Sequence, residues 1–158
     1  MIDKIGIKTT IKELVAYKVL KPSENEVIEC AKLSGELYKK DANPHDPNMV
    51  LYYDSKDTPG CRREVLIPIE NEVKGIETKM MPEIKVAFLV FIGTDQPVSY
   101  YYEELYNYIE EQGLKPSNSV CSLEAVYQPH EFNLSYGSLI DEDNPEHWRT
   151  EIMIPVEE

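Results

Sequence analysis

The chain has 158 residues, 42% of them hydrophobic and 28% charged, which suits one domain with a buried core and excludes a wholly disordered chain. Its 29 acidic and 16 basic residues give a net charge of −13, which opposes direct binding to nucleic acid and favours a cationic partner. Three cysteines and three histidines lack metal-site spacing, and no apolar run could span a membrane. These features predict a cytoplasmic protein without a metal ion or cofactor.

The first half of the chain predicts a strand, a helix and two further strands. Residues 13–21 (ELVAYKVLK) have strand character, and the S-x-x-E pattern beginning at Ser23 predicts a capping box. The helix then runs to about Lys40, and strands follow at 48–54 and 62–70. The helix face expected to pack inward comprises Val27, Ala31, Ser34 and Tyr38.

The second half predicts the same order of elements. A buried strand at 83–93 (EIKVAFLVFIG) precedes a helix that ends at Gly113, and strands follow at 119–128 and 149–156. The apolar stripe of this helix comprises Tyr101, Leu105, Tyr108 and Ile109. Residues 73–81 predict a linking strand between the halves.

One peptide occurs twice, at residues 62–70 (RREVLIPIE) and 149–157 (RTEIMIPVE), with Arg, Glu, Ile, Pro and Glu at the same offsets. This repetition predicts a tandem duplication within a single domain spanning 1–158, with repeats at about 8–72 and 83–157. The predicted fold is α+β: two strand–helix–strand–strand units join their antiparallel sheets about a pseudo-two-fold axis. A central ligand groove would lie between them.

Alternation along the strands separates their side chains onto two faces. Ile152, Ile154 and Val156 are expected to pack under a helix, whereas Glu151 and Met153 would line the groove. In the first copy Glu64 takes the position of Glu151, and Glu124 supplies a third carboxylate. A carboxylate among apolar walls needs a compensating cation, which is either a ligand or an Arg or Lys of the protein in a structural ion pair.

Several aromatic residues lie near these strands and are candidates for the groove wall. Tyr52 is favoured over Tyr53 because it shares a face with Val50 and Asp54. At least one residue of the triplet 100–102 should be exposed or touch the groove. The other candidates are Tyr127 and Trp148.

With these residues the chain resembles the GyrI-like small-molecule-binding family, also described as AraC-type effector-binding domains. The resemblance rests on WRTEIMIPV at 148–156, the preceding helix YYYEELYNYIEEQGL, YYD at 52–54 and EVLIPI at 64–69. It implies a groove for drug-like, often cationic aromatic molecules with an acidic residue as charge partner. By position that partner is Glu151, or Glu124 by a looser match, with Tyr52 as the aromatic of YYD.

Three functions follow from the resemblance. The first is a stand-alone binder of lipophilic aromatic or cationic compounds, because only about a dozen residues precede the first predicted strand, too few for the usual helix-turn-helix unit. The second is a hydrolase that opens strained electrophilic rings, with Glu151 or Glu124 acting beside Tyr127. The third is a DNA gyrase inhibitor-like protein. The expected partners are a small ligand and, for regulation, a transcription regulator or gyrase, without a membrane.

Overall fold

The computed structural model describes residues 1–127, 130–133, 138–141 and 147–157. The described elements are, in chain order, β1 (Ile2–Thr9), β2 (Glu13–Val19), α1 (Glu26–Lys39), β3 (Asn48–Tyr52), β4 (Arg63–Pro68), β5 (Thr78–Met81), β6 (Lys85–Ile92), α2 (Val98–Glu111), β7 (Ser122–Tyr127), β8 (His130–Asn133), β9 (Ser138–Asp141) and β10 (Arg149–Pro155).

Eight of these strands form one antiparallel sheet in the order β1-β6-β10-β7-β3-β4-β2-β5, and β8 pairs with β9 separately. The order is symmetric about the β7–β3 pair: β3-β4-β2 on one side has the connectivity of β7-β10-β6 on the other. The predicted α+β fold with two strand–helix–strand–strand units is confirmed. Its origin by duplication stays a prediction.

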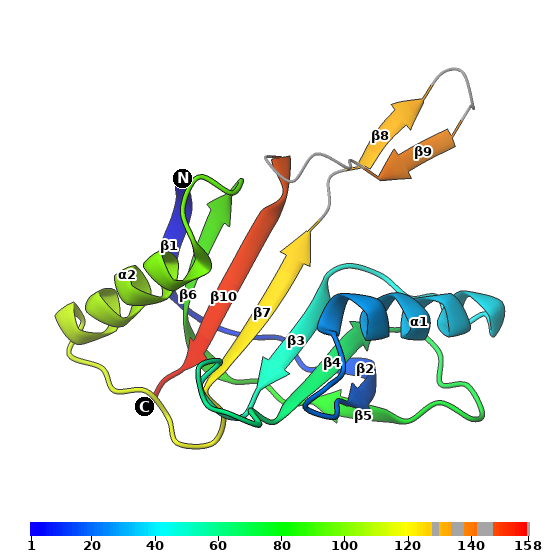
Figure 1. Cartoon of the computed structure of the whole chain (residues 1–158), viewed down its shortest axis with the longest axis horizontal. Coiled ribbons are helices and arrows are strands. Elements are labelled where there is room, and N and C mark those ends of the chain that lie inside the picture. Colours follow the sequence, from blue (N-terminus) through cyan, green and yellow to red (C-terminus); the bar gives the residue numbers. More distant parts are fainter. Residues whose placement is uncertain (128–129, 134–137, 142–146, 158) are drawn as a thin grey trace.

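Both helices cover the same face of the sheet, one over each half (Figure 1). Under α1, Leu33 and Leu37 pack against Val65 and Ile67 of β4. This burial removes the apolar side chains of one helix stripe and one strand face from water together, which is the main favourable term in forming this layer.

The second helix packs in the same way. Tyr101 and Leu105 of α2 are buried against Ile152 and Ile154 of β10, as the alternation of that strand predicted. Gly113 has a φ of 70° and ends the helix, in the left-handed conformation that glycine adopts without steric cost.

The inward face of α1 differs from the prediction. Val27 and Tyr38 are 77% and 68% exposed, whereas Glu29, Leu33 and Leu37 are buried. The N-cap is Asn25, whose side chain accepts a hydrogen bond from the backbone N–H of Ile28; the predicted capping box at residue 23 is therefore wrong by two positions. Gly35 lies on the exposed side.

Two features have no counterpart in the prediction. β1 adds a strand to the edge of the sheet against β6, and the β8–β9 hairpin projects beyond the sheet (Figure 1). Neither described helix has the length and apolarity needed to cross a bilayer. The predicted linking strand is present as β5, at the opposite edge.

Candidate functional site

The three predicted carboxylates do not share one groove. Leu66 and Met153 lie in the apolar cluster of the helix-free face, so Glu64 and Glu151 face that side as predicted. On β7, however, Leu123 and Ala125 belong to that cluster, which turns Glu124 toward the helices. The prediction that all three carboxylates line a common groove is wrong.

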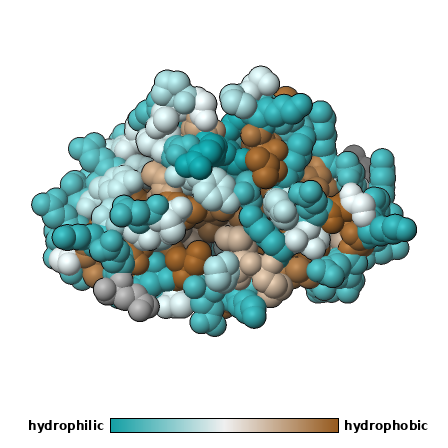
Figure 2. Space-filling model, turned by 90° about the horizontal axis from the view of Figure 1, so that it is seen from below, coloured by the Kyte–Doolittle hydropathy of each residue, from teal (hydrophilic) through white to brown (hydrophobic). Residues whose placement is uncertain are grey.

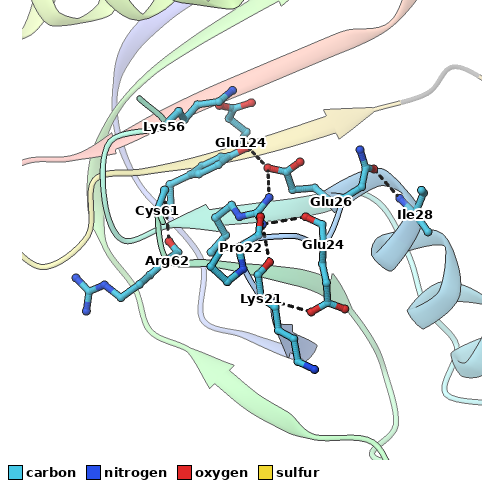
Figure 3. Close-up of polar contacts among 12 residues, drawn as sticks. Lys21, Pro22, Glu24, Glu26, Ile28, Lys56, Cys61, Arg62 and Glu124 are labelled. Atoms are coloured by element: carbon cyan, nitrogen blue, oxygen red, sulfur yellow. Dashed lines mark hydrogen bonds and ion pairs between the residues drawn. The ribbon is translucent and has the colours of Figure 1, made fainter. Parts of the chain in front are cut away.

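Glu124 lies between the helices, above the two central strands, and is held by two partners. Its carboxylate accepts a hydrogen bond of 2.5 Å from the hydroxyl of Tyr102 in α2 and forms an ion pair of 2.9 Å with the Lys56 ammonium. The Tyr102 hydroxyl also lies 3.0 Å from the Ser122 hydroxyl oxygen. Figure 3 shows the heads of Lys56 and Glu124 meeting over the strands. We call the surroundings of Glu124, Tyr52, Tyr102 and Lys56 the inter-helix cleft.

The Lys56 ammonium lies within reach of two aromatic rings. Its nitrogen is 5.1 Å from the ring centroid of Tyr52 and 5.8 Å from that of Tyr102. Burial, followed by the negative charge of Glu124, raises the pKa of both tyrosines above the usual value. Both hydroxyls therefore stay protonated at neutral pH. A carboxylate with two aromatic faces makes this cleft a cation site, occupied here by a side chain of the protein.

Empty space lies on both sides of Lys56. A cavity of about 390 Å³ is lined by Tyr102 and Tyr106 of α2 together with Ser122, and one of about 240 Å³ is lined by Glu26 and Tyr52. Lys56 lines both of them. The lysine that pairs with Glu124 is therefore also part of the wall of both cavities.

Lys56 belongs to the loop 53–62 between β3 and β4. Asp54 closes the base of this loop by accepting hydrogen bonds from the backbone N–H and the guanidinium of Arg62, at 2.9–3.0 Å. These bonds hold the pKa of Asp54 low, at about 2. Lys56 itself lies in an exposed stretch beyond this clamp. The base of the loop is fixed, while the lysine is free of any strand pairing.

Glu151 is 5% exposed and is neutralised by the protein itself. Its carboxylate lies 2.5 Å from the ammonium of Lys8 in β1, which in turn is 4.7 Å from the ring centroid of Phe88. Tyr127 lines a cavity of the helix-free face together with Glu151. Burial, followed by the charge of Glu151, raises the pKa of Tyr127. Lys8 stands on a strand whose backbone is paired with β6.

Glu64 has equivalent partners in the first half. It is 6% exposed, pairs with the Lys79 ammonium of β5 and accepts a hydrogen bond from the Tyr53 hydroxyl. Lys79 lies 4.4 Å from the ring centroid of Tyr17. Burial followed by this hydrogen bond raises the pKa of Tyr53 to about 12.

The two clusters match position for position in the strand register. Glu64 faces Val19 on β2, as Glu151 faces Val90 on β6. Their lysines also correspond, because residue 79 of β5 and residue 8 of β1 pair with equivalent positions of β2 and β6. In each half, the repeated glutamate therefore forms an ion pair with a lysine of an edge strand. This is the structural ion pair that the sequence left open as the alternative to a bound ligand.

The remaining predicted residues divide between the two faces. Met153 and Tyr127 line a cavity on the helix-free face with Glu151, whereas Tyr52 lies in the inter-helix cleft. Trp148 is partly buried just before β10, and its backbone carbonyl accepts a hydrogen bond from Gly93. The acidic segment 142–146 lies outside the described residues. No three His, Cys, Asp or Glu side chains of the described part could hold a metal ion.

Sequence reasoning missed Tyr102 and Lys56. The tyrosine triplet indicated only that at least one of its residues would be exposed or touch the groove, without saying which. In the structure Tyr100 is exposed, Tyr101 is buried and Tyr102 reaches Glu124. Nothing in the sequence marks Lys56, because its loop has ordinary turn composition and its carboxylate partner is 68 residues away.

Solved structures have the same fold at low sequence identity. The EcmrR C-terminal domain matches with a TM-score of 0.70 and 19% identity, covering 98% of each chain. SAV2435 bound to tetraphenylphosphonium matches with a TM-score of 0.56 and 12% identity, covering 98% of this chain and 94% of that one. The hydrolase encoded by lin2189 from Listeria innocua matches with a TM-score of 0.60 and 11% identity, covering 98% and 92%.

EcmrR in its DNA complex also matches, with a TM-score of 0.71 and 18% identity, and the present chain spans 57% of that chain. No family model matches the sequence. No curated protein matches it either. At these identities the likeness establishes the fold, which is that of the GyrI-like effector-binding domains to which the strand peptides and the helix at 100–114 pointed.

Proposed function

We propose that this protein binds lipophilic cations in the inter-helix cleft, with Glu124 as the charge partner and Tyr52 and Tyr102 as aromatic walls. The observation that carries this proposal is the position of the Lys56 ammonium, 2.9 Å from the Glu124 carboxylate and beside both rings. A ligand cation would find the same Coulomb attraction and the same π faces there.

Glu124 differs from Glu64 and Glu151 in the source of its lysine. Lys8 and Lys79 stand on edge strands, where backbone pairing fixes them, whereas Lys56 stands on an exposed loop. Removal of Lys56 from the cleft breaks one partly solvated ion pair and no sheet hydrogen bond. Replacing Lys56 by a ligand cation at its carboxylate therefore costs less than replacing Lys8 or Lys79 would.

Two further observations support a cationic ligand. The net charge of −13 raises the local concentration of cations around the molecule. SAV2435, which has this fold, is a protein solved with tetraphenylphosphonium, a lipophilic cation. The cavities of about 390 and 240 Å³ that flank Lys56 supply volume beside the carboxylate for such a ligand.

Calorimetric titration with tetraphenylphosphonium tests the proposal. We expect saturable binding that Glu124→Gln weakens at least about tenfold, because the ligand loses its charge partner in a partly desolvated site. Lys56→Met should strengthen binding about three- to tenfold, since the internal competitor is removed. Circular dichroism of each variant checks that the fold is retained.

Two matched variants separate local from general effects. Glu151→Gln removes a buried carboxylate on the opposite face and should leave affinity within about twofold. Lys32→Met changes the net charge as much as Lys56→Met does, at an exposed position of α1. Equal effects of Lys56→Met and Lys32→Met, or full binding by Glu124→Gln, would contradict the proposal.

Hydrolysis of a strained electrophile in the same cleft is the second candidate, favoured by the hydrogen bond between Tyr102 and Glu124. The tyrosine hydroxyl would position or protonate the opening ring while the carboxylate directs water. The pairing of Glu124 with Tyr127 is unsuited to this reaction, because the two side chains lie on opposite faces of the sheet. Turnover of a cyclopropane-bearing electrophile, lost in Glu124→Gln and in Tyr102→Phe with the fold intact, would place the protein among hydrolases.

A further inference from the structure

A second cavity lies on the helix-free face, under two chain segments that cross the sheet. Figure 1 shows the chain between β1 and β2 passing behind the sheet, on the side away from both helices. Thr10 of this segment is bonded to the β5–β6 connection: its N–H donates to the Ile84 carbonyl at 2.8 Å, and the Ile84 N–H donates to its hydroxyl at 2.9 Å. We call residues 9–13 and 81–84 together the strap.

The strap and the sheet enclose about 480 Å³. The sheet side of this cavity consists of buried apolar side chains, among them Met49, Leu51 and Met153, each no more than 6% exposed. Met81 and Ile84 of the strap face them. Figure 2 looks at the end of the molecule where β10 finishes and shows hydrophobic surface in the middle of that end, bordered by hydrophilic residues.

Charged side chains lie at one end and at the rim of this cavity, away from its apolar sheet wall. Lys8 and Glu151 form an ion pair of 2.5 Å at one end. Glu13, His45 and Asp46 lie at the rim. Inside the cavity, a charged group of a ligand would have to break the Lys8–Glu151 pair or lie beside apolar walls, and both are costly. An uncharged ligand meets neither cost.

We propose that this cavity is a second ligand site, which takes an uncharged, predominantly apolar small molecule between the sheet and the strap. Its volume lies in the range of about 300–1,000 Å³ that small-molecule sites have. Three methionines, Met49, Met81 and Met153, give a wall that adapts to different shapes.

This site is separated from the inter-helix cleft by the sheet itself. On β7, Leu123 lines the strap cavity while its neighbours Ser122 and Glu124 point to the helix side. A ligand in one site therefore touches none of the side chains that hold a ligand in the other. The two sites also differ in chemistry, since one offers a carboxylate between tyrosines and the other an apolar wall.

Fluorescence titration with the neutral probe N-phenyl-1-naphthylamine tests the second site in the full chain. Val120→Trp and Ile84→Trp each extend a half-buried cavity side chain into the empty volume, so each should weaken binding at least about tenfold. Val73→Trp is the matched control, a half-buried valine that packs against the α1 cluster instead, and should change affinity less than about twofold.

The same titration distinguishes the second site from the cationic one. Glu124→Gln should leave probe affinity within about twofold, and excess tetraphenylphosphonium should not displace the probe, whether or not that cation binds in the cleft. The proposal is overturned if the probe shows no saturable signal, if neither cavity-filling variant weakens it, or if Glu124→Gln weakens it as strongly as Val120→Trp. Two filling variants are used so that misfolding of one leaves the other to decide.

Discussion

The carboxylate of Glu64 is buried on one face of the sheet. The free-energy cost of removing it from water is offset by the groups that surround it. Lys79 supplies the opposite charge and the Tyr53 hydroxyl supplies a hydrogen bond. Because a buried group that loses a charged partner keeps its full desolvation cost, such a cluster is more sensitive to the loss of one member than an exposed ion pair is.

Glu64→Gln should therefore lower the free energy of unfolding by about 1–3 kcal/mol, because Lys79 then has no carboxylate partner in the cluster. Glu70→Gln, on the exposed residue at the end of the same peptide, should change it by less than about 0.5 kcal/mol. Urea denaturation of both variants makes the comparison. Equal values would show that the buried pair contributes nothing beyond a surface charge.

Asp54 provides a residue-scale test by pH. Its pKa is lowered to about 2 by the hydrogen bonds from Arg62, whereas an unfolded aspartate titrates near about 3.9. The stabilisation from ionised Asp54 is thus complete above the unfolded value and is lost as pH falls through the folded one. An NMR titration should place the carboxyl midpoint near 2, and Arg62→Ala should raise it. An unchanged midpoint in that variant would rule out the Arg62 guanidinium as a cause.

At the scale of single elements, the start of α1 shows how a local pattern can mislead. The segment Ser23–Glu26 fits a capping box, but the backbone reaches helical geometry only after Asn25. Glu24 instead accepts hydrogen bonds from the backbone N–H of residue 21 and from Lys18, which use its side chain outside the helix. Glu26, the glutamate of the predicted capping box, pairs with Arg63 at 2.8 Å, and the helix is capped two residues after the predicted cap.

Asn25→Ala should destabilise the protein by about 0.5–2 kcal/mol, because the N–H of Ile28 loses its side-chain acceptor. Ser23→Ala tests the cap that the sequence suggested and should change stability by less than about 0.5 kcal/mol. Thermal unfolding followed by circular dichroism measures both. A larger effect at residue 23 than at residue 25 would contradict the cap seen in the structure.

The element scale also explains which parts of the site could be predicted. Alternation assigned Ile152 and Ile154 correctly to the helix side, because a β-branched stripe beside a helix pattern identifies the packed face. The same rule could not place Glu124, since both faces of β7 carry apolar residues and the assignment depends on register with β3 and β10. In α1, Leu33 and Leu37 compete with the predicted stripe, and only the sheet decides between them.

At the scale of the whole molecule, one continuous sheet joins both halves through the pairing of β3 with β7. The order of elements along each half was predictable from the sequence pattern, and the single domain stays a prediction. The edge strand β1 was not predicted, because no repeat or motif marks residues 2–9 as a partner of β6. Long-range pairing of this kind leaves no local trace in the sequence.

The shared sheet predicts that the two halves unfold together. Fluorescence of Trp148 reports on the second half, and thiol labelling of Cys30 in α1 reports on the first, in a variant carrying Cys61→Ser and Cys121→Ser. Both probes should give the same urea midpoint within about 0.2 M, as a two-state domain requires. Separate midpoints would mean that each half is stable alone.

The placement of β1 has a consequence for how the chain acquires its structure. Residues 4–9 complete their hydrogen bonds only with residues 85–90, on the far side of the whole first unit. During synthesis this segment must therefore wait, unpaired, until residues 85–90 have left the ribosome. Closing so long a loop makes this docking a late and slow event, and until then the exposed border of β6 is the place where a neighbouring nascent chain could attach instead.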